Sequence, residues 1–287
     1  MSAILKLVQG TPDWHAHRAK SRNASETATV MGVSPWQTPY QLWLVRTGRV
    51  KQEVTAAMQH GSTLEGAARA AYEAKTGLVM EPLVLQEGEF SASLDGITLG
   101  GERILEIKCP FKGRKSELWK SVADGEIPTH YGWQIEHQLM VSKAAGAHLW
   151  VFDGTEGILL EVMPQPERWP QIDWAWSEFM HFLESDTPPP LTDKDTLLRE
   201  DNAWIEAATA YVQAKRVADQ ASTKVESAKA ALVSLATHSS ESGGRVTVTR
   251  FIKKGAVDYA RVPQLKDVDL EEYRSPTRQE IRVSVSA

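Results

Sequence analysis

The sequence predicts an α/β domain, in which helices flank a mixed central β-sheet, followed by a smaller extension. Three observations support this prediction. An alternating pattern marks two strands within 90–109, two more strands are expected at 147–152 and 157–163, and helical patterns occupy 58–75, 130–142 and 169–183. The proline run at 188–190 interrupts this order, so the predicted domains are 1–187 and 188–287.

The composition is that of an ordinary globular protein. The chain has 287 residues, of which 42% are hydrophobic and 24% charged, and this suits one large domain with an appendage. The sequence shows neither a signal peptide nor an apolar run of about 18 residues, and its single cysteine, Cys109, excludes an internal disulfide. We therefore expect an intracellular, reducing compartment and no membrane partner. The net charge of −5 argues against a passive nucleic-acid binder but leaves a nuclease open.

The first helical signal lies close to a basic residue. Asn23–Ser25 is expected to cap a short helix over Glu26–Met31, and Arg18 precedes it. A helix N-terminus with Ser25 and a nearby arginine can bind a phosphate. The alternative is an ordinary cap beside a solvated arginine.

A second short helix begins with Thr38 and Pro39 and is expected to end near Thr47, before Gly48. Three aromatic residues lie in or just before this helix: Trp36, Tyr40 and Trp43. We expect all three in the hydrophobic core rather than on the surface as platforms for nucleotide stacking.

The helix at 58–75 has an alanine-rich face that can pack closely on a sheet. Glu65 and Arg69 lie one turn apart on another face. They form either an ordinary surface ion pair or, if Glu65 leans over the hairpin, a third carboxylate for a metal site. The segment 79–85 that follows is expected to be an edge strand because Pro82 cannot donate a ladder hydrogen bond.

The hairpin at 90–109 carries the best candidate for chemistry. Gly96 and the pair at 100–101 are expected to form its turn, and the alternation places Glu106 and Lys108 on one face of the second strand. Asp95 at the end of the first strand can then meet them. Two carboxylates suit a hard divalent cation, and a lysine can orient water or stabilise charge at phosphorus. The alternative is a surface strand with one Glu–Lys pair.

Polar residues follow the hairpin on both of the next segments. Lys112, Arg114 and Lys115 form a basic cluster, which could contact a DNA backbone or be a solvated loop. On the helix at 130–142, Gln134 shares one face with Tyr131 and Gln138. Such glutamines could orient a water or a phosphate, or be plain surface.

The extension differs in character from the first domain. A single helix is expected over 201–237, with a narrow, alanine-rich seam at 3,4 spacing. This helix could be a coiled-coil arm or, as we favour, lie on its own domain. A strand at 245–252 and its return at 256–259 are expected to form a hairpin, for which both DNA contact and protein contact are open.

Taken together, these motifs resemble the phage lambda exonuclease / YqaJ-type viral recombinase family, a branch of the PD-(D/E)xK nucleases. The resemblance covers about residues 10–185. Five motifs in order carry it: W-x-x-x-R…A-S at 14–25, G-x-x-x-E at 61–65, S-x-D-G at 93–96, L-E-I-K-C-P at 105–110 and Y-x-x-Q-I-E-H-Q at 131–138. The sequence departs from the family name at Leu94, which stands where the proline of "PD" would be. That proline has no chemical role, so the departure is minor.

The resemblance implies a metal-dependent catalytic core of the PD-(D/E)xK type. Asp95, Glu106 and the carbonyl of Ile107 would bind Mg²⁺ or Mn²⁺, with two ions per site. Glu65 would assist the metal or its waters, and Lys108 would activate or orient the attacking water.

The resemblance also implies roles for residues outside the hairpin strands. Gln134 would help to place the water. Arg18, Ser25 and Ser93 would form a pocket for the 5′-phosphate of the DNA.

The function that the resemblance implies is Mg²⁺-dependent 5′-to-3′ digestion of double-stranded DNA in a phage or prophage recombination system, which leaves 3′ overhangs. The family further implies a ring-shaped homotrimer, a single-strand annealing protein as partner, and the cytoplasm of a bacterial host. A structure-specific endonuclease on the same core and a non-catalytic DNA-binding or scaffold protein are the alternatives.

Overall fold

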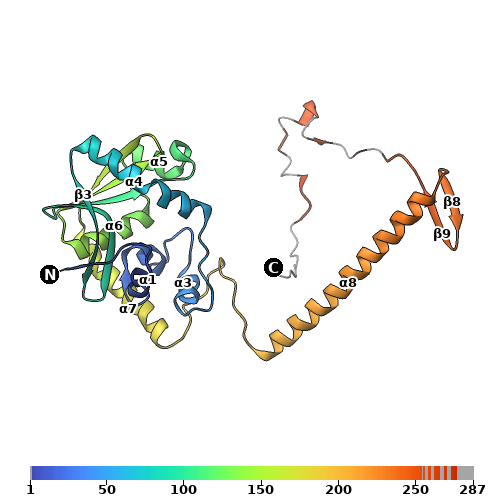
Figure 1. Ribbon diagram of the computed structural model, residues 1–287, viewed down its shortest axis with the longest axis horizontal. Coiled ribbons are helices and arrows are strands. Elements are labelled where there is room, and N and C mark those ends of the chain that lie inside the picture. The colour runs from blue at the N-terminus through green and yellow to red at the C-terminus, as the bar shows by residue number, and fades with distance from the viewer. Residues whose placement is uncertain are drawn as a thin grey trace. The chain divides into compact units, whose positions relative to one another are not determined.

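The computed structural model describes residues 2–253 together with 255, 258–259, 262–265, 268–269 and 273–276. These residues belong to two compact units, Met1–Leu197 and Leu198–Ala287 (Figure 1). The first unit contains a sheet with helices packed on it, and the second contains one long helix and a small hairpin.

The sheet of the first unit is mixed, as predicted. Its strand order is β1-β3-β4-β5-β6-β7, and β2 pairs with β4 beside this path. The strands are β1 Ala3–Leu5, β2 Arg22–Asn23, β3 Met80–Glu87, β4 Phe90–Thr98, β5 Arg103–Lys108, β6 Gly146–Phe152 and β7 Gly157–Val162. The β2–β4 and β5–β6 pairs are parallel, and the other neighbours are antiparallel. A parallel pair needs a long crossover, and helices supply it between β5 and β6.

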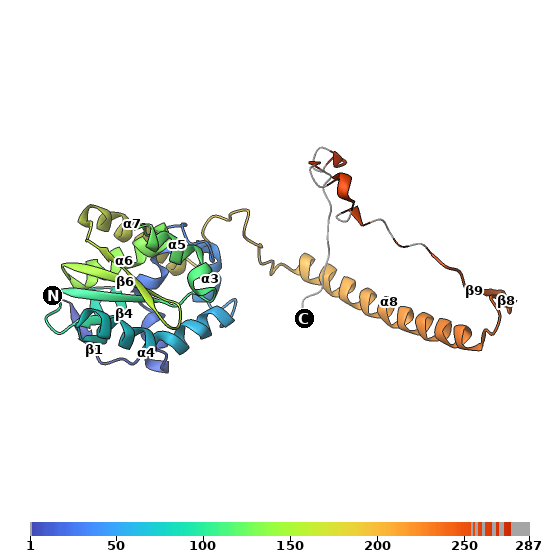
Figure 2. The ribbon, with the colours of Figure 1, turned by 90° about the horizontal axis from the view of Figure 1, so that it is seen from above.

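Helices cover both faces of this sheet and enclose two hydrophobic cores (Figure 2). The helices are α1 Pro12–Arg18, α2 Thr27–Val30, α3 Pro39–Arg46, α4 Ala56–Thr76, α5 Glu117–Ala123, α6 Thr129–Ser142 and α7 Trp169–Glu184. The larger core includes Leu94, Ile104, Ile135, Leu139 and Trp176. The smaller core, under α4, includes Ala68, Tyr72, Leu105, Ile107 and Trp150. Neighbouring residues of β5 thus enter opposite cores, which confirms the predicted alternation.

The turn of the central hairpin lies later than expected. Gly96 is not a turn residue but belongs to β4, where it pairs with Leu105 of β5. A Cβ atom at Gly96 would come 2.6 Å from Cβ of Met80 on the neighbouring strand. A glycine is therefore required here by close approach of the strands, and the turn follows Thr98.

β3, which the sequence predicts as an edge strand, lies at the edge of the sheet over only half of its length. β1 pairs with Val84 to Gln86 and so covers one half of β3. Pro82 lies in the other half, at a register shift between Glu81 and Leu83. Pro82, which has no N–H to donate, thus lies where β3 has no partner on its outer side. The rest of β3 is covered by β1.

The expectation for the aromatic residues around α3 is wrong at one position. Tyr40 and Trp43 are 2% and 4% exposed, as expected for core residues, but Trp36 is 69% exposed. The helix itself begins as predicted, because Thr38 and Gln41 form a complete capping box ahead of Pro39. Trp36 lies two residues before this cap, in a loop, so it is not on the buried face of the helix.

The first unit continues ten residues beyond the boundary at 187/188 that the proline run predicts. Thr38 Oγ1 donates a hydrogen bond to Asp195 Oδ1 at 2.5 Å, and Gln41 Nε2 donates to the carbonyl of Lys194 at 3.3 Å. The carboxylate of Asp195 also accepts bonds from Thr192. These contacts attach the segment after the prolines to the N-terminus of α3.

The second unit consists of α8, Asn202–Leu235, and a hairpin of β8, Ser240–Gly243, with β9, Val246–Thr249. The long helix is confirmed. The hairpin pairs β9 with the segment before it, whereas of the expected return strand at 256–259 only residues 258–259 lie within the described residues. No residue of α8 is buried in the described structure, so the interpretation that the helix lies on its own domain gains no support. No helix in the described part of the chain combines the length and apolar character needed to cross a lipid bilayer.

Candidate active site

The structure brings together the three hairpin residues that the sequence singles out. Asp95 lies on β4, and its Oδ2 accepts a hydrogen bond of 2.7 Å from the backbone N–H of Ile107 on β5. Glu106 and Lys108 flank Ile107 on the same strand, and Lys108 Nζ lies 2.5 Å from Glu106 Oε1. The strand pairing thus fixes two carboxylates and an ammonium group at one end of β5.

Glu106 is held by three donors although it is only 3% exposed. Besides Lys108, Gln134 Nε2 donates to Oε1 at 2.7 Å and Gln138 Nε2 donates to Oε2 at 2.6 Å. The two glutamines are four residues apart on α6 and therefore share the face that packs on the sheet. Both oxygens of the carboxylate thus have charged or polar partners, as a buried charge requires. The i+4 spacing places Gln138 on the face of Gln134, as the sequence predicts, but the family resemblance implied a role only for Gln134.

The environment of the site raises the pKa of both Asp95 and Lys108. Burial raises the pKa of Asp95 well above its usual value, and the nearby carboxylates of Glu106 and Glu65 raise it further, against the opposing effects of Lys108 and of the Ile107 N–H. Burial alone would lower the pKa of Lys108, but Glu106 above all raises it, so that the net shift is upward. The lysine therefore stays protonated at neutral pH.

Glu65 reaches this site through an arginine. Arg69 on α4 donates from Nη2 to Glu65 Oε1 at 2.8 Å and from Nε to the carbonyl of Asp95, also at 2.8 Å. Glu65 thus forms the predicted ion pair with Arg69. Because Arg69 also binds the main chain of Asp95, this ion pair lies next to the site, and a role of Glu65 at a metal stays open. The negative charge of Glu65 also raises the pKa of Asp95.

The donor chemistry of the site fits a hard divalent cation. Asp95 and Glu106 offer carboxylate oxygens. A bound cation would reduce the repulsion between these two buried carboxylates. In the described part of the chain, no three histidine, cysteine, aspartate or glutamate side chains are arranged as a ready metal site. A cation would therefore rely on main-chain oxygen or water for the rest of its ligands. Burial and the neighbouring carboxylates raise the thiol pKa of Cys109, the residue after Lys108, to about 11, and hard cations such as Mg²⁺ prefer oxygen ligands to sulfur.

The predicted phosphate-binding residues are joined through one tryptophan. Arg18 Nη2 donates to Ser25 Oγ at 3.0 Å, and its guanidinium lies over the ring of Trp14 at 4.6 Å from the centroid. The indole Nε1 of Trp14 donates to Ser93 Oγ at 2.9 Å. Arg18, Ser25 and Ser93 therefore form one connected group, and Trp14 is a member that the sequence analysis did not include.

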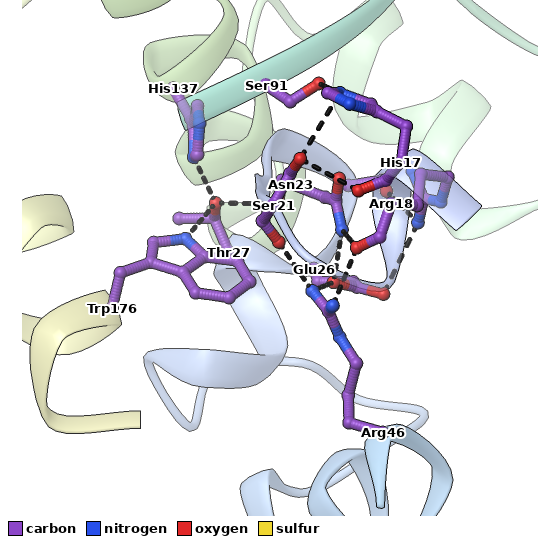
Figure 3. Close-up of polar contacts among 11 residues, drawn as sticks. His17, Arg18, Ser21, Asn23, Glu26, Thr27, Arg46, Ser91, His137 and Trp176 are labelled. Carbon is purple, nitrogen blue, oxygen red and sulfur yellow. Dashed lines mark hydrogen bonds and ion pairs between the residues drawn. The ribbon is translucent and has the colours of Figure 1, made fainter. Parts of the chain in front are cut away.

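A second arginine supports this group from α3 (Figure 3). Arg46 Nη2 lies 2.6 Å from Glu26 Oε2 and also donates to the carbonyl of Ser21 at 2.8 Å. Glu26 Oε1 contacts Arg18 Nη2 at the longer distance of 3.4 Å, and Asn23 Nδ2 donates to Glu26 Oε2 at 3.0 Å. Arg46 lies 20 residues from Glu26 in the sequence, and no local pattern connects the two.

A buried triad fastens the same segment to the helices behind it (Figure 3). Thr27 Oγ1 lies 2.6 Å from His137 Nδ1 on α6 and accepts a bond of 3.1 Å from Trp176 Nε1 on α7. Burial, together with the charge of Arg22, lowers the pKa of His137 to about 3. The imidazole is therefore neutral in the folded protein throughout the physiological range.

This histidine predicts a loss of stability in acid. The unfolded chain binds a proton on His137 below about pH 6.5, but the folded protein does so only near pH 3, so stability falls as the pH is lowered through this window. Full linkage gives a loss of about 3 kcal/mol between pH 7 and pH 4. Urea unfolding at both pH values checks this, and His137→Gln should show a clearly smaller loss. An equal loss in the variant would assign the acid sensitivity to other groups.

The predicted basic cluster is partly neutralised. Arg114 Nε lies 2.6 Å from Asp153 Oδ2, and Arg114 Nη2 lies 2.8 Å from Glu156 Oε2. Arg114 thus serves to attach its loop to the turn after β6, which weakens the DNA-contact interpretation for this residue.

Comparisons with known proteins agree with this arrangement. Residues 13–145 match the family described as YqaJ-like viral recombinase domain. The uncharacterized protein YqaJ of Bacillus subtilis (strain 168) is 30% identical over 136 residues, or 45% of this chain and 41% of that protein. The match thus spans about two fifths of the relative's length.

Among solved structures, an alkaline exonuclease from Laribacter hongkongensis is similar with a TM-score of 0.52 and 25% identity, over 62% of this chain and 94% of that chain. A structure of the same exonuclease in complex with dAMP has a TM-score of 0.52 and 24% identity, over the same shares of both chains. The first unit therefore shares the fold of these structures.

Proposed function

Because residues 13–145 match the YqaJ-like viral recombinase domain, we propose that this chain is a Mg²⁺-dependent exonuclease that digests double-stranded DNA from 5′ to 3′ and leaves 3′ single-stranded overhangs. The observation that carries the proposal is the convergence of Asp95, Glu106 and Lys108 at one end of β5. The similarity of the first unit to nearly the full length of an alkaline exonuclease supports it. The dAMP bound to that enzyme is a nucleoside monophosphate, the product expected of an exonuclease.

In this proposal Asp95, Glu106 and the Ile107 carbonyl would hold Mg²⁺ or Mn²⁺, two ions per site, and Glu65 would assist the metal or its waters. A bound divalent cation polarises the phosphate and lowers the pKa of a water ligand. Gln134 and Gln138 keep Glu106 oriented, since each donates to one of its oxygens.

Lys108 supplies the positive charge of the chain itself. Its ammonium stays protonated because of Glu106, so it acts by hydrogen bonding and charge rather than by accepting a proton. Placed beside the scissile phosphate, it orients the attacking water and stabilises the negative charge that develops on the phosphoryl oxygens.

The direction of digestion follows from the Arg18 group. A 5′-phosphate bound by Arg18, Ser25 and Ser93 would fix the end of the strand relative to Lys108. The new 5′-phosphate formed by each cut would then take the same place and draw the strand forward.

The family resemblance also supports three proposals about assembly: a homotrimeric ring around the DNA, a single-strand annealing protein that receives the 3′ overhang, and action inside a bacterial host cell. A ring is compatible with the net charge of −5, because only its channel has to be basic.

Digestion of 5′-phosphorylated linear duplex, with and without Mg²⁺, tests the activity. We expect release of mononucleotides from linear DNA only when Mg²⁺ is present, and no cleavage of closed circular duplex, which has no end. Cleavage of the circle would favour the alternative of a structure-specific endonuclease. Binding without cleavage of either DNA would favour a non-catalytic DNA-binding or scaffold protein.

A further inference from the structure

A row of aromatic rings leads from the solvent to the candidate catalytic lysine. The ring centroid of Trp36 lies 4.6 Å from that of His130 and 5.8 Å from that of Tyr131. His130 and Tyr131 are themselves 4.2 Å apart at the start of α6. Lys108 Nζ lies 5.0 Å from the centroid of Tyr131. We call the three rings the aromatic wall.

The outer end of this wall presents an unusually open apolar surface. Trp36 is 69% exposed, and the exposure of an indole to water costs free energy that burial in the core would avoid. The loop that carries it is fixed on one side by the capping box of α3 and on the other by contact with His130. The position of the Trp36 ring is therefore fixed by contacts on both sides of its loop, although most of the ring is exposed.

The chemistry of the wall selects the kind of group that it can bind. Burial lowers the pKa of His130, and so does the charge of Lys108, so the imidazole behind Trp36 is neutral at physiological pH. The planes of Trp36 and His130 are nearly perpendicular, at 83°, so the open indole face of Trp36 is the surface on offer. A neutral aromatic ring does not attract phosphate. It suits the face of a nucleobase, on which aromatic side chains stack without sequence preference.

We propose that Trp36 stacks on a nucleobase next to the phosphodiester that Lys108 faces, and so holds that nucleotide unpaired in the site. This inference rests on the proposed nuclease function. Inside a duplex both faces of a base are covered by its neighbours, so an indole can reach a base face only at an end or where the strands have separated.

The test combines removal of the ring with removal of the base. Linear 5′-phosphorylated duplexes carry an abasic nucleotide at the first, second or third position of the 5′ strand. Wild type and Trp36→Ala are compared on each duplex by Kd in EDTA and by kcat and KM in Mg²⁺. Trp36→Phe retains an aromatic ring, and Trp174→Ala removes a similarly exposed tryptophan (66%) from α7 as the matched control.

We expect Trp36→Ala to weaken Kd and raise KM on intact duplex by roughly 5- to 150-fold, the loss of one stacked base. At one position the abasic nucleotide should cost wild type a similar factor and cost Trp36→Ala nothing further, because the same contact is already lost. Trp36→Phe should recover most of the affinity, and Trp174→Ala should match wild type.

Two outcomes overturn the inference while they leave the proposed function intact. One is a Trp36→Ala variant that binds and cuts every duplex as wild type does. The other is a variant that loses the same additional factor as wild type at every abasic position, since a structural role for Trp36 would give that additive result. If wild type neither binds nor cuts DNA, the proposed function fails, and the inference fails with it.

Discussion

Lys108→Ala should lose at least about 100-fold in kcat for DNA hydrolysis, the usual effect of removing one group that stabilises charge in the transition state. The physical reason is that Lys108 is the ammonium group bonded to Glu106 at 2.5 Å, with Asp95 beside it. Duplex binding should change little, because other contacts to the DNA remain. Single-turnover cleavage in Mg²⁺ and anisotropy binding in EDTA measure the two effects separately.

The variant also removes the charge partner of a buried carboxylate, so its stability has to be measured. Gln134 and Gln138 still donate to Glu106, and we expect a folded protein with a lowered Tm. Lys120→Ala is the matched control, because Lys120 on α5 is also a lysine paired with a glutamate, Glu117, at 2.7 Å. Full activity of folded Lys108→Ala would remove Lys108 from the catalytic machinery, whereas equal losses in both variants would indicate a general effect of charge.

The sequence was sufficient for the elements whose patterns are local. Alternation in the hairpin and the pair Thr38 and Pro39 before α3 determine a strand and a helix start within a few residues. The convergence of Asp95, Glu106 and Lys108 also follows from local rules, because two paired strands with known faces leave little choice of geometry.

The parts that could not be predicted depend on contacts between distant segments. Gly96 resembles a turn residue, and its place in β4 is set by the side chain of Met80 on another strand. Arg46 supports Arg18 through Glu26, a link between separate helices that has no spacing rule. Trp36 was assigned to the core by its residue type alone, since the burial of a loop residue depends on the tertiary structure.

The second large effect concerns the end group of the DNA. Removal of the 5′-phosphate should slow digestion by wild type about 10- to 150-fold, the range expected for a lost hydrogen bond to a charged group. Arg18→Ala should be slow on phosphorylated duplex by a similar factor, and dephosphorylation should cost it little more. This non-additivity, measured by kcat/KM on the two substrates, is what direct contact between Arg18 and the phosphate requires.

The geometry explains why Arg18 can accept this ligand. Its contact with Glu26 is long, at 3.4 Å, whereas Arg46 holds the same carboxylate at 2.6 Å. Arg46 can therefore balance Glu26 while Arg18 turns to a phosphate. Burial and the nearby charge of Arg46 both lower the pKa of Arg18, against the opposing effect of Glu26. Burial of the Arg18 guanidinium thus disfavours its positive charge in the free protein, and a bound anion would stabilise that charge.

Arg49 is the matched control for this experiment. Its guanidinium lies over the ring of Trp43 at 4.4 Å and pairs with Asp186 at 2.8 Å, so it repeats the combination of ring and carboxylate around Arg18. Arg49→Ala should digest phosphorylated duplex as wild type does and keep the full dependence on the 5′-phosphate. If Arg18→Ala keeps that dependence as well, the phosphate is bound elsewhere, and the direction of digestion needs another structural cause than the Arg18 group.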